Sequence, residues 1–168
     1  MTWLCMVMED GKMDPLALVF AYAGAAIALL GGFVGSSLGI GAAGTAGTAA
    51  LAEDPKQFRN VLLLASLPMT QTFYGLIVMI QFIYNIKGNV DKIGLETGLA
   101  MLALGLAVAF AEYFSAKYQG RVCASGIAEL PRTKGAVTFS TMILAVYVEL
   151  VGILGMVFGI LGMTLIMS

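Results

Sequence analysis

Four long apolar segments separated by short polar ones dominate the chain. No charged residue occurs between Asp14 and Glu53 or between Arg59 and Lys87, and two further long apolar segments follow, at about 94–129 and 139–161. About 20 apolar residues are enough for a helix to cross the hydrocarbon core of a membrane. The pattern therefore predicts four transmembrane helices.

The two halves of the chain have the same layout, which indicates an internal duplication. Each half has a helix rich in Gly and Ala, a turn of acidic, proline and basic residues, and a second long apolar helix. Pro55 and Pro131 lie 76 residues apart, and Gln71 and Glu149 lie 78 apart. We expect an all-α membrane protein of two duplicated helical hairpins. The expected units are an N-terminal tail (1–14), a first hairpin (15–86), an external linker (87–92) and a second hairpin (93–168).

The composition supports a membrane protein and argues against several other classes. Hydrophobic residues make up 60% of the chain, charged residues only 11%, and the mean hydropathy is +0.93. The absence of His and the presence of only two Cys disfavour a zinc site or a redox pair. A net charge of −1 gives no support for nucleic-acid binding, and no nucleotide-binding motif occurs. The Met-rich start is too short for a signal peptide, so we expect a peripheral tail or a true start at Met13.

Small residues recur every four positions along the first helix. This spacing places them on one face, where they let helix backbones approach closely in lipid. A face of this kind suits the inner wall of a helical assembly. If the first hairpin folds about Pro55, Gln71 lies opposite Gly39 in this stripe. The stripe consists of Gly31, Gly35, Gly39, Ala43 and Gly47.

Glu149 lies near the middle of the fourth apolar segment. An ionisable side chain at this depth is costly unless it is paired, protonated or ligated. The third helix has a stripe with a period of seven residues, and folding the second hairpin near residue 134 brings its Gln119 opposite Glu149. This stripe consists of Gly98, Gly105, Glu112, Gln119 and Gly126.

The second helix adds polar groups at a similar depth. Pro68 cannot donate a backbone hydrogen bond, so it frees carbonyl oxygens in the preceding turn. Leu67, Gln71 and Tyr74 share one helix face with Thr70 beside them. Taken alone, these groups are typical of hydrogen bonding between membrane helices.

Together, one carboxylate and several neutral oxygens form a set that suits a hard cation. A proton site needs only the carboxyl group, so the additional oxygens favour Na⁺ over H⁺. Both ions remain open as the cargo.

Three segments resemble the four-helix proteolipid, the c or K subunit, of V-type rotary ATPases, especially the bacterial sodium-pumping kind. They are LPMTQTFYG at 67–75, YQGRVCASGI at 118–127 and VELVGILG at 148–155. The resemblance implies a homo-oligomeric ring in the membrane lipid that turns against a stator subunit and a central stalk. It also implies that ATP is hydrolysed on other subunits, so this chain would not be an enzyme.

In the sodium-binding members of this family, the ion is held by one backbone carbonyl and four side chains. The resemblance maps these ligands onto Leu67 (carbonyl), Thr70, Gln71, Gln119 and Glu149. It also implies that Tyr74 donates a hydrogen bond to Glu149.

Glu112 departs from the family pattern, in which we expect a small residue at this position. Our first interpretation is structural, an acid paired with a nearby Lys or Arg or reaching the outer interface. The alternative is a role in ion access from the outer side.

The distribution of basic residues predicts the orientation in the cell membrane, because cytoplasmic loops are enriched in Lys and Arg. Six lie in or near the turns at 55 and 131, which we expect in the cytoplasm: Lys56, Arg59, Lys117, Arg121, Arg132 and Lys134. Three lie in the tail and the central loop, Lys12, Lys87 and Lys92, so both termini are expected outside.

A function of a different class is also possible for duplicated membrane hairpins, namely a small secondary transporter or channel. Such a protein is expected to be a monomer or dimer instead of a large ring.

Overall fold

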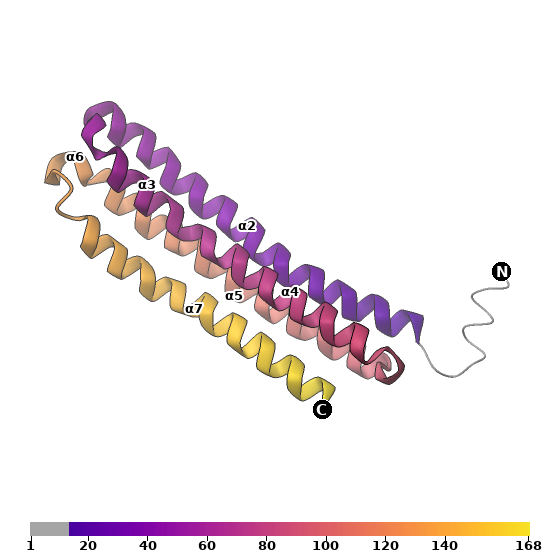
Figure 1. The fold of residues 1–168 in the computed structure, drawn as a ribbon. Coiled ribbons are helices and arrows are strands. Elements are labelled where there is room, and N and C mark those ends of the chain that lie inside the picture. The colour runs from indigo at the N-terminus through magenta and orange to yellow at the C-terminus, as the bar shows by residue number, and fades with distance from the viewer. Residues whose placement is uncertain (1–13) are drawn as a thin grey trace, which may run out of the picture.

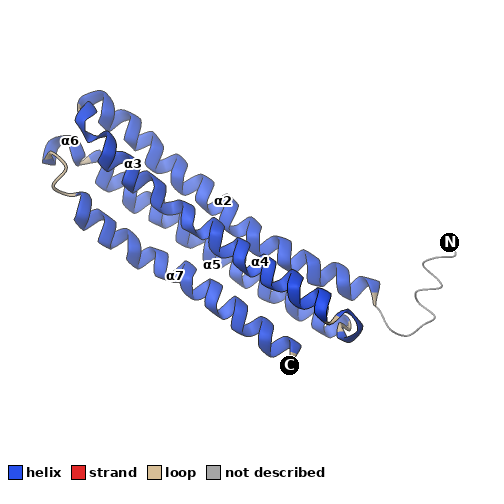
Figure 2. Cartoon of the chain, in the orientation of Figure 1, coloured by secondary structure: helices blue, strands red, loops and turns tan. Residues whose placement is uncertain are grey.

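The computed structural model describes residues 14–168 and consists almost entirely of helices (Figure 2). Four helical spans are long and apolar enough to cross a membrane. They are α2 (Pro15–Glu53), a second span made of α3 (Phe58–Ser66) and α4 (Thr70–Gly88), α5 (Leu95–Ala128) and α7 (Thr138–Met167). Short helical turns connect them: η1 (Pro55–Gln57), η2 (Leu67–Met69), η3 (Val90–Lys92) and α6 (Leu130–Thr133). The prediction of four membrane helices is confirmed, whereas the alternatives for the tail and Met13 lie outside the described residues.

Side-chain caps and proline set the ends of the first helix. The Asp14 carboxylate accepts hydrogen bonds from the backbone N–H groups of Leu16 and Ala17, and Pro15 occupies the first helical turn. Asp54 ends the helix in an extended conformation and caps the next turn by accepting from the Lys56 N–H. These caps satisfy backbone donors that a helix start leaves free.

The spans form two antiparallel hairpins, with α2 and α7 on opposite sides of the bundle and α5 and α4 between them (Figure 1). Glycines allow α2 and α5 to lie close together. A Cβ added at Gly24 would stand 2.5 Å from the carbonyl oxygen of Met101, and one at Gly35 would stand 2.7 Å from the Cα of Tyr113. The small-residue stripe of the first helix is therefore a packing face, as predicted.

The proline in the second span has the expected effect. Pro68 lies in the 3₁₀ turn η2, which separates α3 from α4. The predicted pairing of Gln71 with Gly39 is wrong, because the Gln71 backbone lies against Gly32, and Gly39 packs on Pro68 and Ala116. A 3₁₀ turn rises about 2.0 Å per residue against 1.5 Å in an α-helix, so fewer residues cover the same length. Counting equal residues from the turn therefore underestimates how far along α2 the partner lies, in the direction of the observed shift from Gly39 to Gly32.

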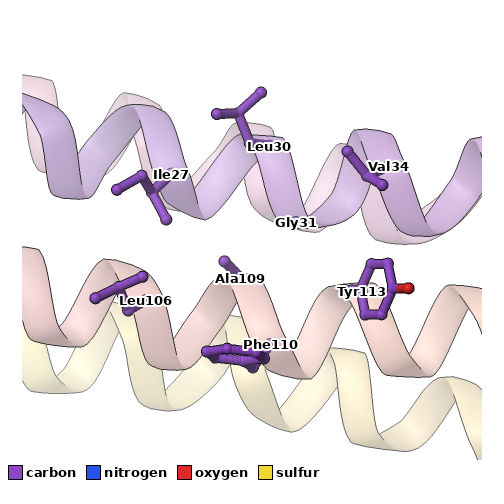
Figure 3. A pocket seen from close by; sticks show the side chains of 8 residues that line it. All are labelled: Ile27, Leu30, Gly31, Val34, Leu106, Ala109, Phe110 and Tyr113. Atoms are coloured by element: carbon purple, nitrogen blue, oxygen red, sulfur yellow. The ribbon is translucent and has the colours of Figure 1, made fainter.

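The outer faces of the bundle are apolar. Leu30 and Val34 on α2 and Phe110 on α5 are exposed, as are Tyr147 and Phe158 on α7. Leu30, Val34 and Phe110 border a groove of about 310 Å³ between α2 and α5, whose lining side chains are apolar except for the hydroxyl of Tyr113 (Figure 3). Such surfaces suit contact with lipid or with other apolar helices rather than with water.

Candidate ion-binding site

Glu149 lies in the middle of α7 and is almost fully buried, with 8% of its surface exposed. Its two carboxylate oxygens accept hydrogen bonds from two other helices. The Tyr74 hydroxyl on α4 donates to Oε1 at 2.8 Å, and the Gln119 amide nitrogen on α5 donates to Oε2 at 3.1 Å. The predicted pairing of Gln119 with Glu149 is confirmed, and Tyr74 makes the hydrogen bond that the resemblance implies.

Gln71 connects this pair to the rest of the network. Its buried amide nitrogen donates to the Gln119 Oε1 at 2.8 Å and to the Ser115 Oγ at 3.0 Å. The Ser115 hydroxyl in turn donates to the backbone carbonyl of Val148, at 3.0 Å. Hydrogen bonds to groups of both hairpins therefore orient the side-chain amides of Gln71 and Gln119.

The proline turn supplies two further oxygens. The Thr70 Oγ lies 3.2 Å from the Leu67 carbonyl oxygen and 3.2 Å from the Gln71 Oε1. One hydroxyl proton can serve only one of these acceptors at a time. The five residues expected to bind the ion, together with Tyr74, therefore lie in one connected network.

Ser115 was missed by the sequence analysis. It stands four residues before Gln119 and three after Glu112, so helical spacing alone places it on the same face of α5. An isolated serine in an apolar helix gives no other signal, because it often bonds within its own helix.

The structural interpretation of Glu112 is wrong. This side chain is fully buried, and neither of its carboxylate oxygens has a hydrogen-bond partner among the described residues. Lys117, the nearest basic residue along α5, donates to the Tyr113 hydroxyl instead. Within residues 14–168, Glu112 therefore neither forms the expected ion pair nor reaches an interface.

The network offers a carboxylate, a hydroxyl, a backbone carbonyl and side-chain amide oxygens in a buried space. These are hard oxygen ligands, which suit a cation of the alkali or alkaline-earth type. Binding such an ion would neutralise Glu149, the one charged member of the network.

Comparison with known proteins identifies the family of this chain. A family model that describes the C subunit of ATP synthase matches residues 23–82 and 102–162, one segment in each half of the chain. The chain belongs to this ATP synthase family. The two matches within the family confirm the duplicated hairpin.

Two relatives illustrate the similarity. The chain is 33% identical to the V-type sodium ATPase subunit K of Enterococcus hirae over 156 residues, which cover 93% of this chain and 94% of the relative. It is 32% identical to the A-type ATP synthase subunit K of Methanocaldococcus jannaschii over 149 residues, which cover 89% of this chain and 63% of that protein. The resemblance to a V-type ATPase proteolipid is confirmed, and the chain is a multi-pass membrane protein.

Proposed function

We propose that this chain is the rotor-ring subunit of a V-type rotary ATPase and carries Na⁺ across the membrane on Glu149. Identical copies form the ring, and ATP is hydrolysed on other subunits, so the chain itself is not an enzyme. The hydrogen-bonded oxygen network around Glu149 is the observation that carries this proposal.

Four groups and the Glu149 carboxylate are the proposed ligands. The side-chain oxygens of Thr70, Gln71 and Gln119 and the Leu67 carbonyl are connected to Glu149 through the hydrogen-bond network. The hydrogen bonds that now join them use the same oxygens that an ion would take, so ion binding replaces contacts among the ligands. Tyr74 remains available to hold the Glu149 carboxylate in place.

Neutralisation of Glu149 explains how the ring can turn. A loaded, neutral site enters the lipid at low cost, whereas an empty site carries a charge that the lipid opposes. The proposed partners are therefore a stator subunit, where the ion is exchanged, and a central stalk that transmits rotation. The relative from Enterococcus hirae, a sodium ATPase subunit, supports Na⁺ as the cargo.

We propose that both termini lie outside and the turns near residues 55 and 131 lie in the cytoplasm. Lys117 and Arg121 belong to α5 rather than to a turn. The basic residues in a turn, in the helical turn next to it or in the N-terminal tail are Lys56, Arg59, Arg132 and Lys134 on one side and Lys12, Lys87 and Lys92 on the other, so the charge difference is smaller than the sequence count suggests.

The test is the reaction of Glu149 with dicyclohexylcarbodiimide in purified rings at fixed pH. The reagent attacks the protonated carboxyl, so bound Na⁺ is expected to slow the labelling and K⁺ is not. The rate is followed by mass spectrometry of the peptide that contains Glu149. Labelling that responds to pH but not to Na⁺ would contradict sodium binding and favour the same ring carrying H⁺.

The size of the assembly distinguishes a rotor subunit from the alternative function, a small secondary transporter or channel. A rotor subunit is expected to migrate as a large ring in mild detergent, as measured by native mass spectrometry. A monomer or dimer would favour the small transporter or channel.

A further inference from the structure

A second carboxyl group lies inside the bundle and is not among the ligands assigned above. Glu112 stands near the middle of α5, and its side chain is fully buried. Both oxygens lack a hydrogen-bond partner among residues 14–168. A buried acid without a partner must lose its charge or bind a cation, because an isolated charge in an apolar medium is very costly.

Two glycines on α7 make room for this carboxyl group. A Cβ added at Gly152 would stand 2.8 Å from the Glu112 Oε2 and 3.0 Å from the Ser115 Oγ. A Cβ added at Gly155 would stand 3.5 Å from the Glu112 Oε1. Any larger residue at position 152 would enter the space that the carboxyl group occupies, so α7 is shaped around the acid.

The surroundings of Glu112 favour a proton over a metal ion. Na⁺ and Ca²⁺ take several oxygen ligands in proteins. Here the groups that approach the space beside Gly152 and Gly155, other than Glu112 itself, are the Ser115 Oγ, the Gln71 Cγ and the Ala111 Cβ, and of these three only the first is an oxygen. The ionisable groups that α4 and α7 contribute at this level, Tyr74 and Glu149, carry no positive charge.

We propose that Glu112 is a second cation-binding carboxyl group of this chain and that the cation it takes is a proton. The protonated acid is neutral and gains an O–H donor. The Ser115 hydroxyl oxygen accepts one hydrogen bond from Gln71 and keeps a second lone pair, toward which the protonated Glu112 would turn its O–H to form a hydrogen bond that the structure itself does not contain.

The proton on Glu112 thus extends the network of the ion site by one step. The proposed hydrogen bond would join Glu112 to Ser115, which existing hydrogen bonds connect through Gln71 and Gln119 to Glu149. Glu112 acts as a positioning residue that orients the Ser115 hydroxyl, and it does not exchange its proton for the transported ion. The proton site itself does not depend on whether Na⁺ or H⁺ is the cargo.

Infrared spectroscopy of rings with the substitution Glu149→Gln tests the protonation directly. Acids in the polar turns are ionised at neutral pH, so Glu112 is expected to supply a protonated-carboxyl C=O band. The additional substitution Glu112→Gln should remove this band. As a matched control, substitution of the exposed Glu96 by Gln in the same background should leave it unchanged.

Either of two infrared results would overturn the proposal. One is that Glu112→Gln removes an ionised-carboxylate band instead of the protonated one. The other is that the Glu112 band disappears when Na⁺ is added, which would make Glu112 a sodium ligand. Neither result bears on sodium binding at Glu149, because the substitution Glu149→Gln has removed that carboxylate from these rings.

A second measurement tests the positioning role in rings that retain Glu149. Glutamine can donate the same hydrogen bond as a protonated acid, so Glu112→Gln is expected to change the Na⁺ affinity by no more than about twofold. Glu112→Leu removes the donor and should weaken Na⁺ binding about three- to tenfold, as expected for one lost hydrogen bond. A loss of more than tenfold in Glu112→Gln would show that the ionised form is used and would overturn the proposal.

Discussion

The two hairpins share one architecture but differ in where they place charge. In the first hairpin, α2 has no charged residue before its final Glu53, and the buried polar side chain at the start of α4 is the neutral Gln71. In the second hairpin, α5 and α7 contribute the buried acids Glu112 and Glu149. The duplication has thus produced one half that packs and one half that carries ionisable groups.

This difference shows how a single site can be built from two similar halves. The first hairpin contributes neutral oxygens and donors through Thr70, Gln71 and Tyr74, whereas the second contributes the charge through Glu149. If a carboxylate also stood at position 71, equivalent to Glu149, the two negative charges would repel each other. In a buried space this repulsion disfavours ionisation of both groups. The proposed site would accordingly hold one cation per four helices, at Glu149.

The largest effect is expected when the charged half is made neutral. Glu149→Gln removes the only charge of the proposed site, so ion transport by the reconstituted ATPase should be abolished. The ring should still assemble, because an amide of the same shape keeps hydrogen bonds to its neighbours. Transport is measured as ²²Na⁺ uptake into vesicles, and the ring by native mass spectrometry. Loss of the ring itself would mean that the carboxylate is mainly structural.

A substitution on the packing half should act on stability. Gly24→Ala places a methyl group 2.5 Å from the Met101 carbonyl oxygen, and both helix backbones would have to move. We expect a loss of about 2 kcal/mol in stability, typical of overpacking, measured by thermal unfolding in detergent.

Gly44→Ala is the matched control for this prediction. A Cβ at Gly44 meets no atom within 4 Å, so alanine should be neutral or raise stability by up to about 1 kcal/mol through helix propensity. Equal effects of the two substitutions would show that close packing of α2 on α5 is not what Gly24 provides.

The neutral ligands should affect affinity less than the charge affects transport. Gln119→Ala or Thr70→Ala removes one proposed ligand, and we expect about tenfold weaker Na⁺ binding, or about 1.4 kcal/mol. The rate of carbodiimide labelling without Na⁺ should change less, because the proton needs only Glu149. Gln81→Ala, on α4 outside the network, is the control. An equal loss of sodium and proton binding would indicate a general distortion of the site.

The smallest effect is expected at the turn that joins α2 to α3. A hydrogen bond from the Gln57 amide, with further help from the Lys56 N–H and the Lys134 ammonium, lowers the pKa of Asp54 below its usual value. A lowered pKa in the folded state stabilises the protein above the unfolded pKa, and this contribution is lost as the pH falls through the folded value. Asp54→Asn should therefore lower the melting temperature slightly at neutral pH.

The difference between Asp54→Asn and the parent chain should shrink as the pH falls through the lowered pKa of Asp54, because the aspartate then becomes protonated. A difference in melting temperature that is independent of pH would mean that the capping geometry, not the charge, is what Asp54 contributes.

Local patterns along the chain were sufficient for much of the fold and of the site. Runs without charge predicted the four spans, because hydrophobic length is a local property that lipid selects directly. The period-seven stripe of the third helix is buried as expected, since Gly98, Gly105, Glu112, Gln119 and Gly126 all lie inside. The depth of Gln119 relative to Glu149 was also predictable, because α5 and α7 are both long α-helices on either side of a short turn.

Other features depended on how the helices pack against one another. The 3₁₀ turns of the second span and the way its helices pack on α2 shifted the register, so Gln71 lies at Gly32 rather than at Gly39. Ser115 joined the network because it lies between Gln71 and Val148, which belong to two other helices. The burial of Glu112 without a partner likewise follows from the glycines of α7, which are distant along the chain. Helix periodicity tells which residues share a face, but relative rise and close approach between helices determine which faces meet.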